Sequence, residues 1–325
     1  MSKNVLVTMK SDKDLRRIIQ DRLGGRAGVI YLEDLAAADR EETFKSADVL
    51  MFFRLLEEIA PREIALLENL SLLQSVPAGV ETLPFKDLPS KMTICANAGA
   101  WSAPLAEYIV GLMIALNREL VAHRRKLARG EYDRVNSRYL RGRVLGIVGF
   151  GGIGLAAARL VRPMGLRIMA LNSRGRTDEA VEFIGTLADL DHLLQLADVV
   201  LLAAPLTKRT RGLIGARELN LMKDDAILIN VARGAIVDED ALYEHLKTHP
   251  DFKFGADVWW REPLTGSEFS LKHPLFDFPN VLGTPHNADH VEGMQSEATA
   301  AAAENVGDFL EGRPIRGVVD RSDYL

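Results

Sequence analysis

The sequence predicts an α/β protein with two doubly wound, parallel-sheet domains. Its 325 residues exceed the size at which a single hydrophobic core usually stops growing. Short apolar runs alternate with amphipathic segments along most of the chain, and strands separated by helices imply a parallel sheet covered by helices. Apolar residues make up 47% and charged residues 26% of the chain, which excludes a disordered or low-complexity protein.

The first series of strands fills the N-terminal hundred residues. Apolar runs predict strands at Val5–Val7, Val29–Leu32, Val49–Phe53 and Leu72–Val76. After the first strand, the segment Ser11-Asp12-Lys13-Asp14 offers a helix cap, apolar residues follow at helical spacing from Leu15 to Leu23, and Gly24-Gly25 ends the helix. Further helices are expected through residues 35–44 and 64–70.

The second series follows one long apolar helix, predicted from Ala103 to about Arg129. Its expected strands are Val144–Val148, Arg167–Leu171, Val199–Ala203, Ala226–Val231, Phe254–Val258 and Val281–Leu282. Six strands with helices between them suit a doubly wound sheet. An alanine-rich helix, Ser296–Leu310, closes the chain. We therefore expect a discontinuous domain of residues 1–98 and 290–325, a larger domain of residues 99–289, and a cleft between the two.

The charge and cysteine content limit which partners the protein can bind and in which cellular compartment we expect it. Forty Lys and Arg against 45 Asp and Glu give a net charge of −5, which offers no basic face for nucleic acid. Cys95 is the only cysteine, so no internal disulfide or thiolate metal cage can form. The N-terminus lacks a signal-peptide pattern, and the apolar run Tyr108–Leu116 is too short to cross a bilayer. We expect a cytoplasmic protein with no metal site and no membrane partner.

A glycine-rich loop follows the predicted strand Val144–Val148 directly. It reads Gly149-Phe150-Gly151-Gly152-Ile153-Gly154 and opens a helix. The first glycine permits a tight turn, the second lets backbone approach a pyrophosphate, and the third lets helix and strand pack closely. The helix N-terminus then offers free N–H groups to phosphates. A loop of purely structural purpose is the alternative, but the strand before and the helix after favour dinucleotide binding by the larger domain.

The residues that end the next strand bear on the choice of dinucleotide. A carboxylate there would bind the adenosine ribose and favour NAD. This chain has Asn172, Ser173 and Arg174 instead, with Arg176 close behind. Because guanidinium groups pair well with a 2′-phosphate, NADP(H) is favoured and NAD(H) remains possible. The alternative is a solvated basic turn.

Three later segments end strands of the same predicted sheet: Asn230–Gly234, Asp257–Pro263 and Gly283–His286. Pro205-Leu206-Thr207 lies ahead of them, and Val237–Leu242 follows the first. With these ordered motifs the chain resembles the D-isomer-specific 2-hydroxyacid dehydrogenase family, including glyoxylate/hydroxypyruvate reductases, over nearly its whole length.

The resemblance implies a catalytic set. Arg233 would bind the carboxylate of the substrate and polarise its carbonyl. His286 would donate a proton to the carbonyl oxygen as hydride arrives, and remove it in the reverse direction. Glu262 would hydrogen-bond the other imidazole nitrogen and fix the tautomer. The alternatives are a surface ion pair for Arg233 and an ordinary loop acid for Glu262, and His290 is the nearest competing histidine.

The same resemblance implies the binding residues. Backbone N–H groups at Ala78 and Gly79 would hold the substrate carboxylate, and Asp257 would face the nicotinamide carboxamide. Pro205, Val231 and Ala232 would lie beside the cofactor. Arg54 ends an N-terminal strand and either reaches the substrate or pairs with Glu57 or Glu58 at the surface.

The resulting expectation is reduction of a small 2-oxo acid, glyoxylate or hydroxypyruvate, by NAD(P)H. An NAD-linked dehydrogenase such as phosphoglycerate dehydrogenase is the alternative within the enzyme class. A dinucleotide-sensing interaction protein, as in the family's corepressors, is the alternative from another class. The long apolar helix from Ala103 resembles the family's dimerisation arm and implies a homodimer.

Overall fold

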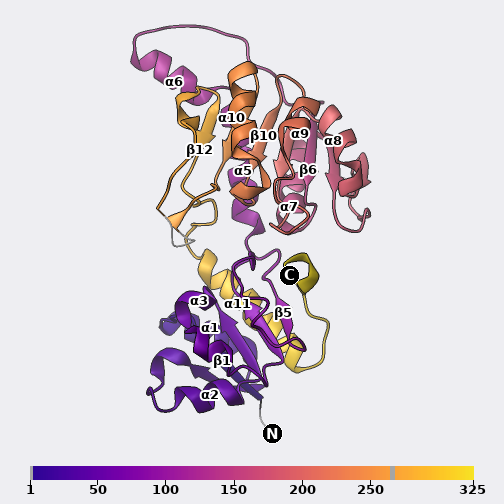
Figure 1. Cartoon of the computed structure of the whole chain (residues 1–325). Coiled ribbons are helices and arrows are strands. Elements are labelled where there is room, and N and C mark those ends of the chain that lie inside the picture. The colour runs from indigo at the N-terminus through magenta and orange to yellow at the C-terminus, as the bar shows by residue number, and fades with distance from the viewer. Residues whose placement is uncertain (1–2, 264–267) are drawn as a thin grey trace. The chain divides into compact units, whose positions relative to one another are not determined.

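The computed structural model describes residues 3–263 and 268–325 (Figure 1). The chain forms two compact units, Met1–Trp101 with Val291–Leu325, and Ser102–His290; the expected division fell at residues 98 and 290. Each unit contains one parallel sheet, of five strands in the first and seven in the second. The α/β fold class with two doubly wound sheets is therefore confirmed.

The first unit has the strand order β2-β1-β3-β4-β5, and every pairing is parallel. The strands are β1 (Lys3–Val7), β2 (Ala27–Tyr31), β3 (Val49–Phe52), β4 (Leu72–Ser75) and β5 (Thr93–Cys95). The helices are α1 (Lys13–Leu23), α2 (Arg40–Ser46), α3 (Leu55–Glu58), α4 (Pro61–Ile64) and α11 (Met294–Leu310). Although they are far apart in sequence, α11 packs along α1, as Figure 1 shows in yellow and indigo.

The predicted start and end of α1 are both confirmed. The Asp12 side chain accepts a hydrogen bond from the Leu15 N–H, which satisfies one of the free donors of the first turn. Gly24 ends the helix with φ of 56°, a left-handed conformation that glycine adopts without cost. Leu15, Ile19 and Leu23 are buried, so the apolar stripe faces the core.

The second unit has the strand order β12-β11-β10-β9-β6-β7-β8, again with every pairing parallel. The strands are β6 (Val144–Val148), β7 (Arg167–Leu171), β8 (Phe183–Gly185), β9 (Val199–Leu202), β10 (Ile227–Asn230), β11 (Lys253–Ala256) and β12 (Val281–Gly283). The strand order reverses between β6 and β9, and ligands of open α/β sheets bind beyond the carboxyl ends of the strands at such a point.

The second unit contains the helices α5 (Ser102–Asn117), α6 (Leu120–Ala128), α7 (Gly152–Val161), α8 (Leu190–Leu196), α9 (Ala216–Leu221) and α10 (Glu239–Thr248). Within the described residues of this unit the α-helices cover the sheet, except α6, which contacts α5. Packing of α5 against α7 is extensive, and Gly255 of β11 leaves the room that Leu112 and Leu116 of α5 fill. Across residues 3–263 and 268–325, no helix is long and apolar enough to span a membrane.

The prediction of one helix from Ala103 to about Arg129 is wrong. The helix ends at Asn117, because Glu119 adopts a left-handed conformation with φ of 49°. A separate helix, α6, begins at the next residue. The first helix, α5, is buried along one side, whereas α6 has no buried residue. The structure also adds two strands that the sequence did not predict, β5 and β8, each of three residues.

Candidate active site

The glycine-rich loop joins β6 to α7 with the geometry that a pyrophosphate cradle needs. Gly149 has φ of 103°, and a Cβ there would lie 2.4 Å from the Ala204 nitrogen. A Cβ on Gly154 would lie 2.4 Å from the Gly149 carbonyl oxygen, so strand and helix pack with no room to spare. Gly151, in contrast, faces open space with nothing within 4 Å, at the N-terminus of α7. These residues fit a dinucleotide, whose pyrophosphate would occupy the space beside Gly151.

Asn172 organises the turn at the end of β7. Its Oδ1 accepts from the Arg174 N–H at 3.0 Å, and its Nδ2 donates to the Arg176 carbonyl at 3.0 Å. The side chains of Arg174 and Arg176 are exposed, and no ion pair to either is found within the described residues. The turn therefore presents two guanidinium groups that an anion can bind.

His286 and Glu262, two of the predicted site residues, form a direct side-chain contact. The Nδ1 of His286 lies 2.7 Å from the Oε2 of Glu262, whose other oxygen accepts from the Trp259 N–H. Glu262 is buried and the imidazole is partly exposed. Since a carboxylate only accepts, the proton on the ring lies at Nδ1 and Nε2 points elsewhere. The geometry suits a histidine that exchanges protons through Nε2.

Arg233 leaves the carboxyl end of β10 in a fixed loop. Its Nη1 donates to the Ala232 carbonyl at 2.6 Å, and its own carbonyl accepts from the Asn230 side chain at 2.9 Å. The next residue, Gly234, packs so closely that a Cβ there would lie 2.3 Å from the Trp259 carbonyl carbon. The loop of Arg233 thus contacts the loop that carries Glu262. Both leave neighbouring strands at the same edge of the sheet as His286.

Asp257, expected at the nicotinamide, is buried and heavily hydrogen-bonded by the protein itself. Its Oδ1 accepts from the Thr284 hydroxyl at 2.6 Å and from the Asn287 N–H at 3.0 Å. Its Oδ2 accepts from the Ala288 N–H at 2.9 Å. Thr284 also contacts the Tyr108 hydroxyl. Sequence reasoning missed Tyr108 and Thr284, because nothing in the residue pattern links α5 to the loop after β12.

The other predicted residues lie at carboxyl ends of strands. Ala78 and Gly79 follow β4 in the first unit, and Pro205 follows β9 in the second. Val231 and Ala232 are buried directly after β10. Arg54 pairs with Glu57 at 3.3 Å at the surface of the first unit, and the side chain of His290 is 72% exposed.

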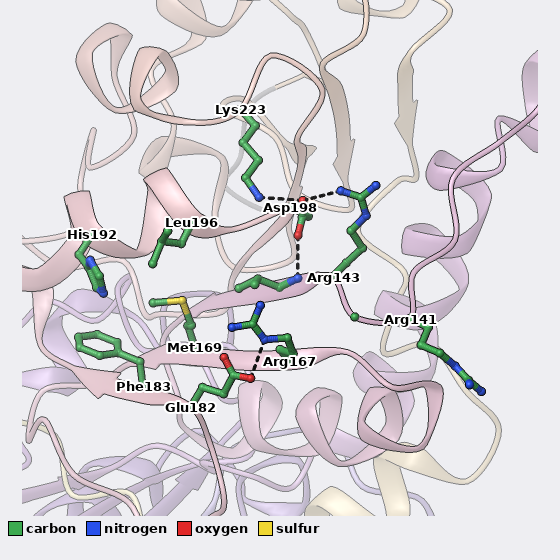
Figure 2. A pocket seen from close by; sticks show the side chains of 12 residues that line it. Arg141, Arg143, Arg167, Met169, Glu182, Phe183, His192, Leu196, Asp198 and Lys223 are labelled. Carbon is green, nitrogen blue, oxygen red and sulfur yellow. Dashed lines mark hydrogen bonds and ion pairs between the residues drawn. The ribbon is translucent and has the colours of Figure 1, made fainter.

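A pocket of about 590 Å³ opens at the opposite edge of the second sheet (Figure 2). It lies at the amino ends of β6, β7, β8 and β9, and no predicted site residue lines it. Its charges are largely paired, since Asp198 binds Lys223 at 2.8 Å and Arg143 at 3.2 Å, and Arg167 binds Glu182 at 2.6 Å. The described residues include no group of three or more His, Cys, Asp or Glu that could hold a metal ion.

Comparison with known proteins identifies the family. The model for "D-isomer specific 2-hydroxyacid dehydrogenase, NAD binding domain" matches residues 110–288. A D-3-phosphoglycerate dehydrogenase of Methanocaldococcus jannaschii is 33% identical over 321 residues, which cover 97% of this chain and 59% of that protein. A glyoxylate reductase of Aeropyrum pernix is 35% identical over 233 residues, 69% of this chain and 68% of that protein.

Solved structures agree along the whole chain. A putative formate dehydrogenase of Pyrobaculum aerophilum has 26% identity and a TM-score of 0.83, with 100% of each chain covered. A D-isomer-specific 2-hydroxyacid dehydrogenase of Xanthobacter autotrophicus, in complex with NADPH and MES, has 25% identity and a TM-score of 0.80 with the same coverage.

The matched model and the strand order of the second unit define a dinucleotide-binding α/β protein. The chain belongs to the D-isomer-specific 2-hydroxyacid dehydrogenase family. It spans 59% and 48% of the length of two curated D-3-phosphoglycerate dehydrogenases that it matches, those of Methanocaldococcus jannaschii and Archaeoglobus fulgidus.

Proposed function

We propose that this protein reduces a small 2-oxo acid, with glyoxylate and hydroxypyruvate as the leading candidates, to the D-2-hydroxy acid. The observation that carries the proposal is the 2.7 Å contact between His286 Nδ1 and Glu262 Oε2. It lies at the carboxyl edge of the sheet whose strand β6 ends in the glycine-rich loop. A proton-transfer pair and a dinucleotide cradle on one sheet edge are what such a reduction needs.

In this proposal the protein binds the charged substrate and transfers the proton, and a bound NAD(P)H would supply the hydride. Arg233 binds the substrate carboxylate and polarises the carbonyl. As an imidazolium, His286 gives the proton on Nε2 to the carbonyl oxygen. The neutral ring keeps its Nδ1 proton toward Glu262, so the carboxylate holds the ring and its tautomer through the proton transfer.

We favour NADP(H) over NAD(H) as the cofactor. The glycine-rich loop, Gly149 to Gly154, would hold the pyrophosphate at the N-terminus of α7. Arg174 would pair with the 2′-phosphate, with Asn172, Ser173 and Arg176 around it. Pro205, Val231 and Ala232 would lie along the cofactor. Three of the four lone pairs of the Asp257 carboxylate accept hydrogen bonds from the protein, so one on Oδ2 is left for the nicotinamide carboxamide.

The test is a panel of short 2-oxo acids with NADPH and with NADH, followed by loss of nicotinamide absorbance. We expect turnover of glyoxylate or hydroxypyruvate that is faster with NADPH. Turnover in His286→Ala and Arg233→Ala variants at the wild-type rate would contradict the assignment of these residues.

A second candidate is NAD-linked oxidation of 3-phosphoglycerate. It is favoured by the 33% identity to the Methanocaldococcus jannaschii protein across 97% of this chain. Reduction of NAD with 3-phosphoglycerate, in the absence of glyoxylate turnover, would favour it over our proposal. Cofactor binding with no turnover of any acid would instead favour a dinucleotide-sensing interaction protein.

We also propose a homodimer assembled through α6 and the segment that follows it. Within these twenty residues of chain, the large apolar side chains of Leu120, Leu127, Tyr132 and Tyr139 are between 51% and 84% exposed, and such exposure is a feature of surfaces that bind a partner. Leu127→Glu with Tyr132→Glu should convert a dimer into a monomer by sedimentation equilibrium. A monomeric wild-type protein at micromolar concentration would refute the dimer.

A further inference from the structure

Three side chains from separate elements of the second unit form a chain of hydrogen bonds that ends on the loop of His286. Tyr108 lies in α5, Thr284 follows β12 and Asp257 follows β11. The Tyr108 hydroxyl contacts the Thr284 hydroxyl, which lies 2.6 Å from Asp257 Oδ1. Asp257 in turn accepts from the N–H groups of Asn287 and Ala288 at 3.0 and 2.9 Å.

The direction of each hydrogen bond follows from the number of hydrogens available. The Asp257 carboxylate can only accept hydrogen bonds, so Thr284 donates its single hydroxyl hydrogen to Oδ1. Tyr108 is then the donor to the Thr284 oxygen. Burial raises the pKa of the Tyr108 hydroxyl above its ordinary value, so this donor keeps its proton at neutral pH.

These hydrogen bonds hold His286 in a backbone conformation that residues other than glycine rarely adopt. His286 has φ of 54°, a left-handed conformation that costs a residue other than glycine about 1–3 kcal/mol unless its surroundings enforce it. Asp257 binds the two N–H groups that directly follow His286, and Thr284 stands two residues before it. One buried carboxylate therefore clamps the strained residue from both sides.

We infer that Tyr108 and Thr284 are positioning residues: they hold the Asp257 carboxylate in the orientation that sets the loop, and through it the direction of the His286 imidazole. Neither side chain needs to touch the substrate for this. The inference rests on the proposed function, because it takes His286 as the group that exchanges the proton. It gives Asp257 a task that is separate from any contact with the cofactor.

The sharpest test compares two substitutions of Thr284. Thr284→Val keeps the shape but removes the hydroxyl, whereas Thr284→Ser keeps the hydroxyl. We expect kcat for the 2-oxo acid to fall about 10- to 100-fold in Thr284→Val, since a displacement of about 1 Å can cost that much. KM and the Kd of NADPH should stay within about twofold, and Thr284→Ser should restore most of kcat.

Tyr108→Phe removes the outermost donor and should lower kcat about three- to tenfold. Tyr31→Phe is the matched control, because its hydroxyl makes a long 3.4 Å hydrogen bond in the other unit, and it should leave kcat unchanged. A loss of thermal stability in Thr284→Val with kcat unchanged would show a merely structural role and overturn the inference. Equal losses in Thr284→Val and Thr284→Ser would overturn it too.

A readout independent of turnover separates this inference from the proposed function. Hydrogen exchange at the Asn287 and Ala288 amides should accelerate about tenfold or more in Thr284→Val, and exchange at the Gly149–Gly154 loop should not. If the wild-type protein turns over no 2-oxo acid, the proposed function fails while the exchange result still reports on the clamp. Unchanged exchange at Asn287 and Ala288 would overturn the clamp itself.

Discussion

His286 and Glu262 are 24 residues apart in the chain, and their side chains share a 2.7 Å hydrogen bond. The glutamate is buried and is held at its other oxygen by the Trp259 N–H. A carboxylate fixed in this way holds the imidazole ring in one orientation and one tautomer, with the Nδ1 proton toward Glu262.

The first prediction concerns this pair. His286→Asn should lower kcat by about 10²- to 10⁴-fold, the usual contribution of a general acid. Glu262→Gln keeps an oxygen that can accept from Nδ1 but removes the negative charge, so kcat should fall less, by about 10- to 100-fold. Steady-state kinetics with glyoxylate and NADPH measure both effects.

The exposed His290, four residues further on, is the matched control for this experiment. His290→Asn should leave kcat within about twofold of the wild type. An equal loss in the His286 and His290 variants would remove the assignment.

The second prediction separates two glycines of the phosphate loop. Gly149→Ala combines a φ of 103° with a Cβ placed 2.4 Å from the Ala204 nitrogen, so the free energy of unfolding should drop by about 3 kcal/mol or more. Gly151→Ala meets nothing within 4 Å and should unfold like the wild type. Its Cβ would instead take the space of the pyrophosphate, and the Kd of NADPH should rise about tenfold or more.

Urea unfolding and fluorescence titration with NADPH measure these two effects. Tight NADPH binding by a stable Gly151→Ala variant would argue against the loop as the phosphate site.

The third prediction tests the choice of cofactor. Arg174→Ala removes a charge-assisted partner of the 2′-phosphate, so KM for NADPH should rise about tenfold or more while KM for NADH changes little. Arg141→Ala is the matched control, because Arg141 is also an exposed arginine of this unit but lines the pocket at the other edge of the sheet. A rise in both KM values in Arg174→Ala would point to a loss of structure at the turn.

The fourth prediction concerns the pH dependence of stability. Burial, with a smaller effect from the neighbouring His249, lowers the pKa of His245 to about 4. The buried Nε2 of His245 has no hydrogen-bond partner among the described residues. In the unfolded chain the pKa of the imidazole is about 6.5. Between about pH 4 and this value the unfolded state therefore binds more protons than the folded state. Stability should therefore be complete above about pH 6.5 and decline as the pH falls toward 4.

His245→Phe should remove this decline, because the phenyl ring can stack on His249 and meet Phe252 edge-to-face as the imidazole does. Between pH 7 and pH 5 the wild type should lose about 2 kcal/mol more of its free energy of unfolding than the variant. Urea unfolding at several pH values measures the difference. Parallel profiles for the two proteins would show that His245 takes its proton equally well in the folded state.

The fold was largely predictable because its central strands are continuous apolar runs. The bounds of β6 and β7 agree with those expected, since both strands are buried apart from Arg167 and are followed directly by Gly149 and Asn172. The three-residue strands Thr93–Cys95 and Phe183–Gly185 were missed because so short a pattern is ambiguous, whereas the equally short β12 was predicted at Val281–Leu282. The break at Glu119 was also invisible, because its left-handed backbone interrupts a sequence with no glycine or proline at that point.

The site was predictable in part. The glycine spacing and the segments that end strands follow from the residue pattern, whereas the choice of Arg233, Glu262 and His286 within those segments came from the resemblance to the family. Tyr108 and Thr284 are 176 residues apart in the chain, and their contact depends on how α5 packs on the sheet. No local sequence pattern predicts such a contact. Two of the three hydrogen bonds that Asp257 accepts likewise come from backbone N–H groups, which carry no sequence signature.

The close approach of Gly234 to Trp259 has a consequence for how this protein can be altered. The neighbouring main chain excludes a Cβ on Gly234. The turn that follows Arg233 and the turn that precedes Glu262 therefore pack against each other as one rigid unit. Shortening, lengthening or grafting either segment alone would displace the guanidinium and the carboxylate together. Attempts to change the substrate range by exchanging these turns should therefore transplant the two as a matched pair.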